Sequence, residues 1–263
     1  MAIVFLPDLR IHLAEDGTAD GPAVVFLHGL GLDGTLFDTV LPHMPSGLRL
    51  VRPDLRGHGA SDVPPAPYAM GAMIRDVERV MDHLALKDAV VVGVSLGGLI
   101  AQGLAVKRLD LVRGVVLSNT APRIATPAIW ADRIAEVRAG GLASVAQAAL
   151  ERWFAKGFRA SQPARDLIAR YVLADPEGWC GAAAAIAGAD FRKVTPGLRL
   201  PCLAIAGAHD GSTPPDLMRE MASAIPGSRF TLLREAGHLP MVDAPAEWAA
   251  EVAGFLHGIG HHA

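Results

Sequence analysis

Cysteine, aromatic residues and long apolar segments are all scarce in this sequence. Only Cys180 and Cys202 occur among its 263 residues, which excludes a disulfide framework and a cysteine cluster for zinc. No apolar run reaches about 18 residues, and the first residues lack a basic segment followed by a long apolar core, so neither a membrane span nor a secretory leader is expected. We therefore expect a cytoplasmic protein without a membrane partner.

A strong charge of one sign is also missing. The formal net charge is -3, and acidic and basic residues are mixed along the chain. We find no basic stripe of the kind that binds nucleic acid or anionic lipid, so a small neutral or anionic molecule is the expected ligand. The pair His261 and His262 lies in a glycine-rich tail and is predicted to be solvated rather than to bind a metal.

The sequence does contain a regular alternation of apolar strands and helices. Hydrophobic residues make up 51% of it, enough for the core of one large α/β domain or of a domain with an insertion. Strands that are apolar throughout and separated by helices are typical of a parallel sheet covered on both faces. The expected strands are Ala2–Leu6 and Arg10–Ala14 as an edge hairpin, then Ala23–Leu27, Leu48–Arg52, Val90–Val94, Val112–Leu117, Cys202–Ala206 and Arg229–Leu233.

A block without strands interrupts this alternation. Helices are expected at Met70–Leu84, Pro215–Ala224 and Pro245–Leu256 around the strands, and helical character is expected at Thr35–Leu41. Inside the block, four helices follow one another: Ile129–Arg138, Leu142–Phe154, Ala164–Leu173 and Trp179–Ala187. The sequence therefore predicts a core of residues 1–120 and 194–263, with a helical cap of residues 121–193 inserted into it.

The segment Gly93–Gly97 carries the pattern Gly-x-Ser-x-Gly between an apolar strand and a helix of small residues. In that context the pattern predicts a sharp turn that projects the hydroxyl of Ser95 from the end of the sheet. Glycine is needed on both sides because side chains would collide with the strand or the helix. A pattern this short also occurs in ordinary strand-to-helix turns, so the role of the serine depends on its partners.

A serine hydroxyl is a weak nucleophile at neutral pH and needs a base, which in turn needs a partner that fixes its tautomer. In hydrolases with this turn the order along the chain is serine, acid, histidine. Asp210 follows one core strand and His238 follows the next. Because parallel strands bring their carboxyl ends to one edge of the sheet, we predict a catalytic triad of Ser95, Asp210 and His238.

Other residues compete for two of these roles. His28 and His58 lie in glycine-rich loops and are alternative bases, although both come before the serine. Asp54 is a rival acid, and Asn119 lies where an acid could follow a strand, but it carries no charge. Asp210 itself could be a helix cap or a turn residue.

A tetrahedral intermediate needs N–H donors that already point at its oxyanion. The amide of Leu96, directly after the serine, is one expected donor. The loop His28–Gly31 is expected to supply the second, from the amide of Leu30 or from a neighbouring one.

Together these residues resemble the α/β-hydrolase fold over nearly the whole chain. The resemblance rests on the turn Gly93–Gly98, on the loop Asp54–Asp62 and on the surroundings of Asp210 and His238. It implies hydrolytic machinery that esterases, lactonases and carbon–carbon hydrolases share. It implies no metal and no organic cofactor.

Three further segments are similar to those of the 3-oxoadipate enol-lactonases of aromatic catabolism: Leu117–Ile124, Glu151–Phe154 and Ala184–Phe191. That resemblance implies opening of the ring of 3-oxoadipate enol-lactone to 3-oxoadipate, in the β-ketoadipate pathway, through an acyl-enzyme. The chain differs at His28–Gly31, where those enzymes often carry a Ser-Asn type segment.

The enol-lactone carries a carboxylate, so a cation in the cap would orient it. Trp130 and Arg133 are the candidate substrate-binding pair, with Arg123 as the alternative cation. Arg133 could instead be a surface residue paired with Asp132 or Glu136.

Other functions remain open at this point. A general carboxylesterase or a lactonase for another ring would use the same triad, as would a cofactor-free haloperoxidase-like side activity. A ligand receptor on a hydrolase scaffold would bind without turnover. A second copy of the chain is a candidate partner, through the apolar surface of the cap.

Overall fold

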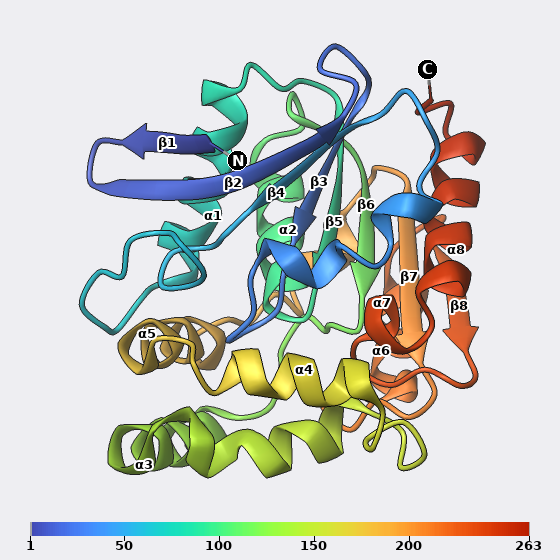
Figure 1. Cartoon of the computed structure of the whole chain (residues 1–263). Helices are drawn as coiled ribbons and strands as arrows, with labels where there is room; N and C mark the ends of the chain where they lie inside the picture. The colour runs from blue at the N-terminus through green and yellow to red at the C-terminus, as the bar shows by residue number, and fades with distance from the viewer. Residues whose placement is uncertain (1, 263) are drawn as a thin grey trace.

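An eight-stranded sheet organises residues 2–262, the part of the chain that the computed structural model describes (Figure 1). The strands are β1 (Ala2–Leu6), β2 (Leu9–Gly17), β3 (Ala23–Leu27), β4 (Arg49–Pro53), β5 (Ala89–Val94), β6 (Val112–Ser118), β7 (Cys202–Gly207) and β8 (Arg229–Leu233). Their order across the sheet is β1-β2-β4-β3-β5-β6-β7-β8. From β4 to β8 all neighbours are parallel, whereas β2 pairs antiparallel with β1 and β4. This confirms the predicted mostly parallel α/β fold.

The central strands are continuous apolar runs because helices bury both of their faces. Every residue of β3, β5 and β7 is buried. The edge hairpin differs, since β1 has only one buried residue, Val4. β2 extends three residues beyond the prediction because Glu15, Asp16 and Gly17 pair with β4.

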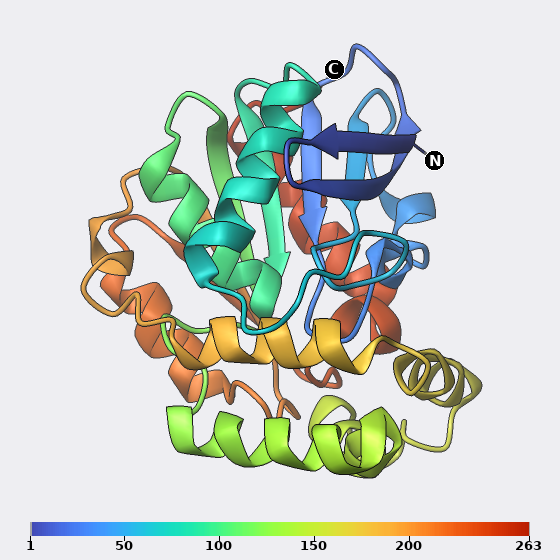
Figure 2. The same ribbon diagram turned by 90° about the vertical axis from the view of Figure 1, so that its left-hand side faces the viewer.

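Helices of the core lie on both sides of this sheet, α1 and α2 on one face and α8 on the other (Figures 1 and 2). They are α1 (Met70–His83), α2 (Leu96–Lys107), α6 (Pro215–Ala224), α7 (Pro240–Asp243) and α8 (Pro245–Gly258). The predicted helix Thr35–Leu41 is instead two short 3-10 helices, η1 (Gly34–Phe37) and η2 (Leu41–His43), and η3 (Thr195–Gly197) precedes β7.

Between β6 and β7 the chain forms α3 (Pro127–Trp153), α4 (Gln162–Tyr171) and α5 (Pro176–Ala187). These helices lie together beyond one end of the sheet in both views (Figures 1 and 2). The two helices predicted on either side of position 141 form one element with a break, because Gly141 has φ of 66° and ψ of -174°. Thr126, Ser161 and Asp175 cap the N-termini of α3, α4 and α5 with their side chains.

The tail prediction was wrong for His261. Its side chain is only 4% exposed, and its Nε2 lies 2.9 Å from the carbonyl oxygen of Ala23, so the end of the chain packs back onto β3. Within residues 2–262, no helix has both the length and the apolar character needed to cross a membrane.

Candidate active site

Ser95 occupies the sharp turn between β5 and α2. It has φ of 55° and ψ of -112°, a left-handed conformation that non-glycine residues rarely adopt and that costs about 1–3 kcal/mol. A Cβ at Gly93 would lie 2.3 Å from the carbonyl oxygen of Gly97, and a Cβ at Gly97 would lie 2.1 Å from that of Leu27. The two glycines are therefore required by close backbone contacts, as the sequence predicts, and they hold the serine at the carboxyl end of β5.

Asp210 and His238 form a buried hydrogen-bonded pair at the same end of the sheet. Asp210 Oδ2 lies 2.8 Å from His238 Nδ1 and also accepts hydrogen bonds from Thr213 Oγ1 and Asn119 Nδ2. Asp210 Oδ1 accepts from the amides of Ser212 and Thr213. Burial by itself would raise the pKa of the Asp210 carboxyl, but His238 and these donors together hold its pKa below the usual value. The carboxylate is thus kept ionised beside the imidazole.

The loops that carry this pair are both attached to the last turn of α3. The amide of Gly211, next to Asp210, donates to the carbonyl oxygen of Arg152 at 2.9 Å. The amide of His238 donates to the carbonyl oxygen of Trp153 at 2.7 Å. The last turn of α3 therefore fixes the backbone next to Asp210 and at His238.

The two predicted oxyanion donors lie beside the serine. Leu96 is the first residue of α2, and Leu30 follows Gly29, whose Cβ position would lie 3.6 Å from Ser95 Cβ. Among residues 2–262, neither amide N–H of these leucines donates to another protein group. This leaves both N–H groups free for a ligand oxygen within the described chain, and their role as oxyanion donors stays a prediction.

A cavity of about 70 Å³ brings the predicted substrate-binding residues to the same place. Ser95, His238, Trp130 and Arg133 all line it. Trp130 is held by a 2.7 Å hydrogen bond from its indole to the carbonyl oxygen of Ile124, and the guanidinium of Arg133 lies 4.9 Å from its ring centroid. At about 15 Å³ of accessible space for each molecule, the cavity has room for roughly five waters. That space suits a small lactone or ester.

Arg152 is a second cation in this cavity, and the sequence analysis did not identify it as a binding residue. Within the described chain, neither Arg152 nor Arg133 has a carboxylate within ion-pair distance. Burial lowers the pKa of both guanidiniums, and the charge of Arg152 lowers that of Arg133 further. Two half-buried cations without counter-ions favour an anionic ligand. Arg123, the alternative, instead lies 3.9 Å from Asp190.

Aromatic side chains form much of the remaining wall, and sequence reasoning missed three of them. The rings of Trp153 and Tyr171 meet edge to face at 4.9 Å between centroids, and those of Trp130 and Trp179 lie 6.4 Å apart. Only folding of the cap shows that they face inward, because residues at these spacings also fit an ordinary helix core.

The rival residues hold loops together. His28 uses both ring nitrogens on neighbouring backbone groups, and burial lowers the pKa of His58 to about 3, which keeps it neutral. Asp54 accepts hydrogen bonds from Gly34, Ala60 and His12. Within residues 2–262 there is no group of three or more His, Cys, Asp or Glu that could hold a metal ion.

Comparison with known proteins agrees with the fold described above. Residues 24–251 match the family described as the alpha/beta hydrolase family. The chain is 32% identical to 3-oxoadipate enol-lactonase 2 of Acinetobacter baylyi over 240 residues, 90% of each protein. It is 30% identical to a pimeloyl-acyl-carrier-protein methyl ester esterase of Chromobacterium violaceum, over 94% of this chain and 98% of that one. The enol-lactonase structure from Burkholderia xenovorans LB400 superposes with a TM-score of 0.94 at 32% identity, covering 97% and 100% of the two chains.

Proposed function

The chain belongs to the α/β-hydrolase family, and from this we propose that it is a serine hydrolase that opens 3-oxoadipate enol-lactone to 3-oxoadipate. One observation carries the choice of substrate: Arg133 and Arg152 line the cavity that holds Ser95 and His238, and neither has a carboxylate partner among residues 2–262. The substrate is small and carries one carboxylate, which matches the size and the charge of that cavity. The similarity to enol-lactonases over nearly the whole chain supports the same choice.

In the proposed reaction, Ser95 Oγ attacks the lactone carbonyl while His238 accepts its proton and Asp210 stabilises the imidazolium. The amides of Leu96 and Leu30 bind the oxyanion. The ring C–O bond then breaks, His238 returns the proton to the enol oxygen, and the enol becomes a ketone. Water, activated by His238, hydrolyses the acyl-enzyme and releases the second carboxylate of the product.

The direct test follows the loss of enol-lactone absorbance with purified protein, beside a panel of neutral p-nitrophenyl esters. We expect ring opening far faster than hydrolysis of the esters. Ser95→Ala should fold normally and lose turnover of both. A folded Ser95→Ala protein that keeps most of its activity would refute the assigned nucleophile.

Arg133→Ala tests recognition of the carboxylate. It should impair kcat/KM for the lactone much more than for a neutral ester, by about tenfold or more, since a hydrogen bond to a charged group contributes roughly 1.5–3 kcal/mol. Equal losses on the two substrates would show that Arg133 does not bind the carboxylate.

A carboxylesterase is the second candidate, and the esterase of Chromobacterium violaceum is the observation that favours it. Good ester turnover without ring opening would support it and leave the triad unchanged. Saturable binding of the lactone without turnover of any substrate would instead favour a receptor.

A further inference from the structure

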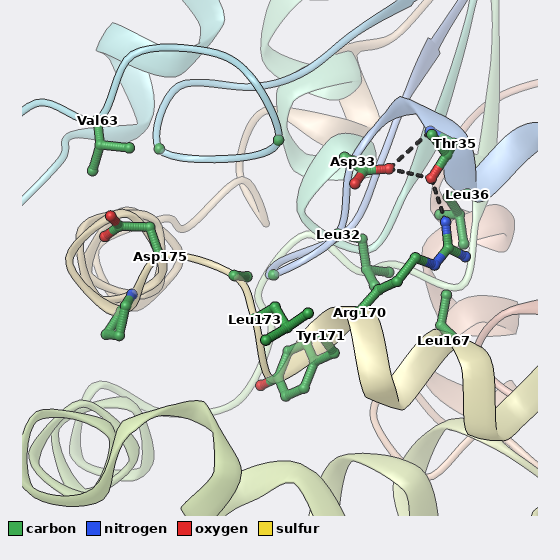
Figure 3. A pocket seen from close by; sticks show the side chains of 15 residues that line it. Leu32, Asp33, Thr35, Leu36, Val63, Leu167, Arg170, Tyr171, Leu173 and Asp175 are labelled. Carbon is green, nitrogen blue, oxygen red and sulfur yellow. Dashed lines mark hydrogen bonds between the residues drawn. The ribbon is translucent and has the colours of Figure 1, made fainter.

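A surface groove of about 620 Å³ adjoins the catalytic cavity, between α4 and the core (Figure 3). Apolar side chains supply much of its wall: Leu32, Leu36, Val63, Leu167 and Leu173. Arg170, on α4, hydrogen-bonds to Thr35, which in turn bonds Asp33. These contacts hold α4, which forms one wall of the groove, against the core.

The groove and the catalytic cavity share Leu32 and Tyr171 as lining residues. Tyr171 is only 2% exposed. Its ring packs against backbone on one side, since a Cβ at Gly31 would lie 2.4 Å from Tyr171 Cε2, and it meets Trp153 on another. The two spaces are therefore separated by a partition about one side chain thick, formed by Leu32 and Tyr171.

The charges on the two sides of this partition differ. Arg133 and Arg152 line the small cavity, whereas Asp33 and Asp175 line the groove together with Arg170, which donates a hydrogen bond to Thr35. An anionic group is favoured in the cavity and disfavoured in the groove. The groove thus suits the uncharged, apolar end of a longer molecule.

We propose that Tyr171, together with Leu32, limits the length of the substrate by closing the catalytic cavity off from the groove, which becomes a subsite for the apolar distal chain of longer esters once this partition is removed. The proposal rests on the proposed ester and lactone hydrolysis at Ser95. It predicts that the protein prefers compact substrates and that the preference belongs to the partition rather than to the triad.

The test is a series of p-nitrophenyl esters from acetate to dodecanoate, together with acetates of lengthening alcohols. In the wild-type protein, kcat/KM should fall once the chain exceeds the small cavity. Tyr171→Ala should raise kcat/KM at least tenfold either for p-nitrophenyl octanoate relative to p-nitrophenyl acetate or for octyl acetate relative to ethyl acetate, because each methylene that leaves water contributes about fourfold. Leu32→Ala removes the other half of the partition and should give a gain in the same series.

Two controls separate the partition from general loosening of the cap. Ile129→Ala changes a residue of α3 that is 43% exposed and lines neither the groove nor the catalytic cavity, so its chain-length profile should match the wild type. Adding Leu167→Trp to Tyr171→Ala narrows the groove next to the removed ring and should reduce the gain.

Several results would overturn the proposal. The first is a wild type without a length limit. The second is a pair of folded Tyr171→Ala and Leu32→Ala proteins with the wild-type profile, and the third is a gain that Leu167→Trp does not reduce. Failure of the wild type to hydrolyse any ester or lactone would overturn the proposed function as well, whereas the first three results leave that function intact.

Discussion

At the scale of single residues, the two oxygens of Asp210 have different partners. Oδ1 accepts the amides of the following turn, and Oδ2 faces His238. The two sequence interpretations of this residue are therefore compatible, because Oδ1 forms the turn and Oδ2 is free to act as the acid partner of His238. Asn119, the rival position, donates to Oδ2 and to the carbonyl oxygen of Gly237, so it supports the pair instead of replacing the acid.

Asp243 carries a partly buried carboxyl close to this pair. Its Oδ2 accepts the amide of Gly237 at 2.7 Å, while Oδ1 is buried with no hydrogen-bond partner among residues 2–262. Burial, aided by the charge of Asp210, raises the pKa of Asp243 to about 7.

The raised pKa predicts a pH-dependent loss of stability that Asp243→Asn should remove. The folded state binds the Asp243 proton more tightly than the unfolded state, so the unfolding free energy falls as pH rises from about 4 to about 7. At about 1.4 kcal/mol per pKa unit, a rise from 3.8 to about 7 corresponds to at most about 4 kcal/mol.

Urea unfolding of both proteins near pH 5 and near pH 8 measures this difference. Between these pH values the free energy of unfolding should fall more for the wild type than for Asp243→Asn. Any destabilisation by the amide itself is the same at both pH values and does not affect this difference. Parallel pH dependences would show that Asp243 titrates normally in the folded protein.

The residues proposed to bind the substrate were harder to predict than those of the proposed triad. Ser95, Asp210 and His238 each follow a strand of a parallel sheet, so topology alone brings them to one edge. Arg152 and Arg133 lie in one helix on either side of the break at Gly141, whose direction depends on packing of the cap. From the sequence, the carboxylate of the expected substrate led us to Arg133, with Arg123 as the alternative, and not to Arg152.

At the scale of elements, α3 is both a wall of the cavity and a support for the catalytic loops. Its last turn accepts the amides of Gly211 and His238, and its side chains face the cavity. A Cβ at Gly237 would lie 2.1 Å from the carbonyl oxygen of Trp153. No other residue fits there without displacing either α3 or the His238 loop.

Gly237→Ala should therefore lower kcat more than it changes KM. A displacement of about 1 Å at the reacting groups costs roughly a hundredfold in rate. Steady-state kinetics below the unfolding temperature measure the effect.

Gly254→Ala is the matched control, because this exposed glycine of α8 has no atom within 4 Å of its Cβ position. It should leave kcat unchanged and stabilise the helix by about 0.5–1 kcal/mol. Wild-type kcat in a folded Gly237→Ala protein would contradict the role assigned to the last turn of α3.

Most elements follow from local pattern, and the exceptions have tertiary causes. β3, α6 and β8 have the bounds that the sequence predicts, since apolar runs and flanking breakers define them. The extension of β2 depends on β4, its neighbour in the sheet but not in the sequence. α7 has only four residues, too few to show a helical period.

At the scale of the whole molecule, α5 packs the helical segment between β6 and β7 against the core. Gly178 approaches the loop after β4 so closely that a Cβ there would lie 2.0 Å from the carbonyl oxygen of Gly57. Gly181 packs on the ring of Tyr68 and accepts that residue's amide with its carbonyl oxygen. The sequence predicted the helices of the cap, but nothing local in it indicates this contact between two glycines that are far apart in the chain.

Gly178→Ala should separate α5 from the core. Overpacking against backbone costs about 1–3 kcal/mol, and each kcal/mol lowers the Tm of a protein of this size by roughly 2–4 °C. Because α5 also places Trp179 in the cavity wall, KM for the lactone should rise in the same variant. Thermal unfolding and steady-state kinetics measure the two effects.

Gly188→Ala, at the other end of α5, separates this contact from a general effect of alanine. Its Cβ position has ordinary contacts, the nearest at 3.7 Å, and its φ is -86°, which alanine adopts readily. It should keep the Tm and KM of the wild type. If Gly178→Ala also kept the wild-type Tm and KM, the contact between Gly178 and Gly57 would not hold α5 in place. Other contacts would then position these helices, among them those of α3 with the loops of Asp210 and His238 and the hydrogen bond from Arg170 to Thr35.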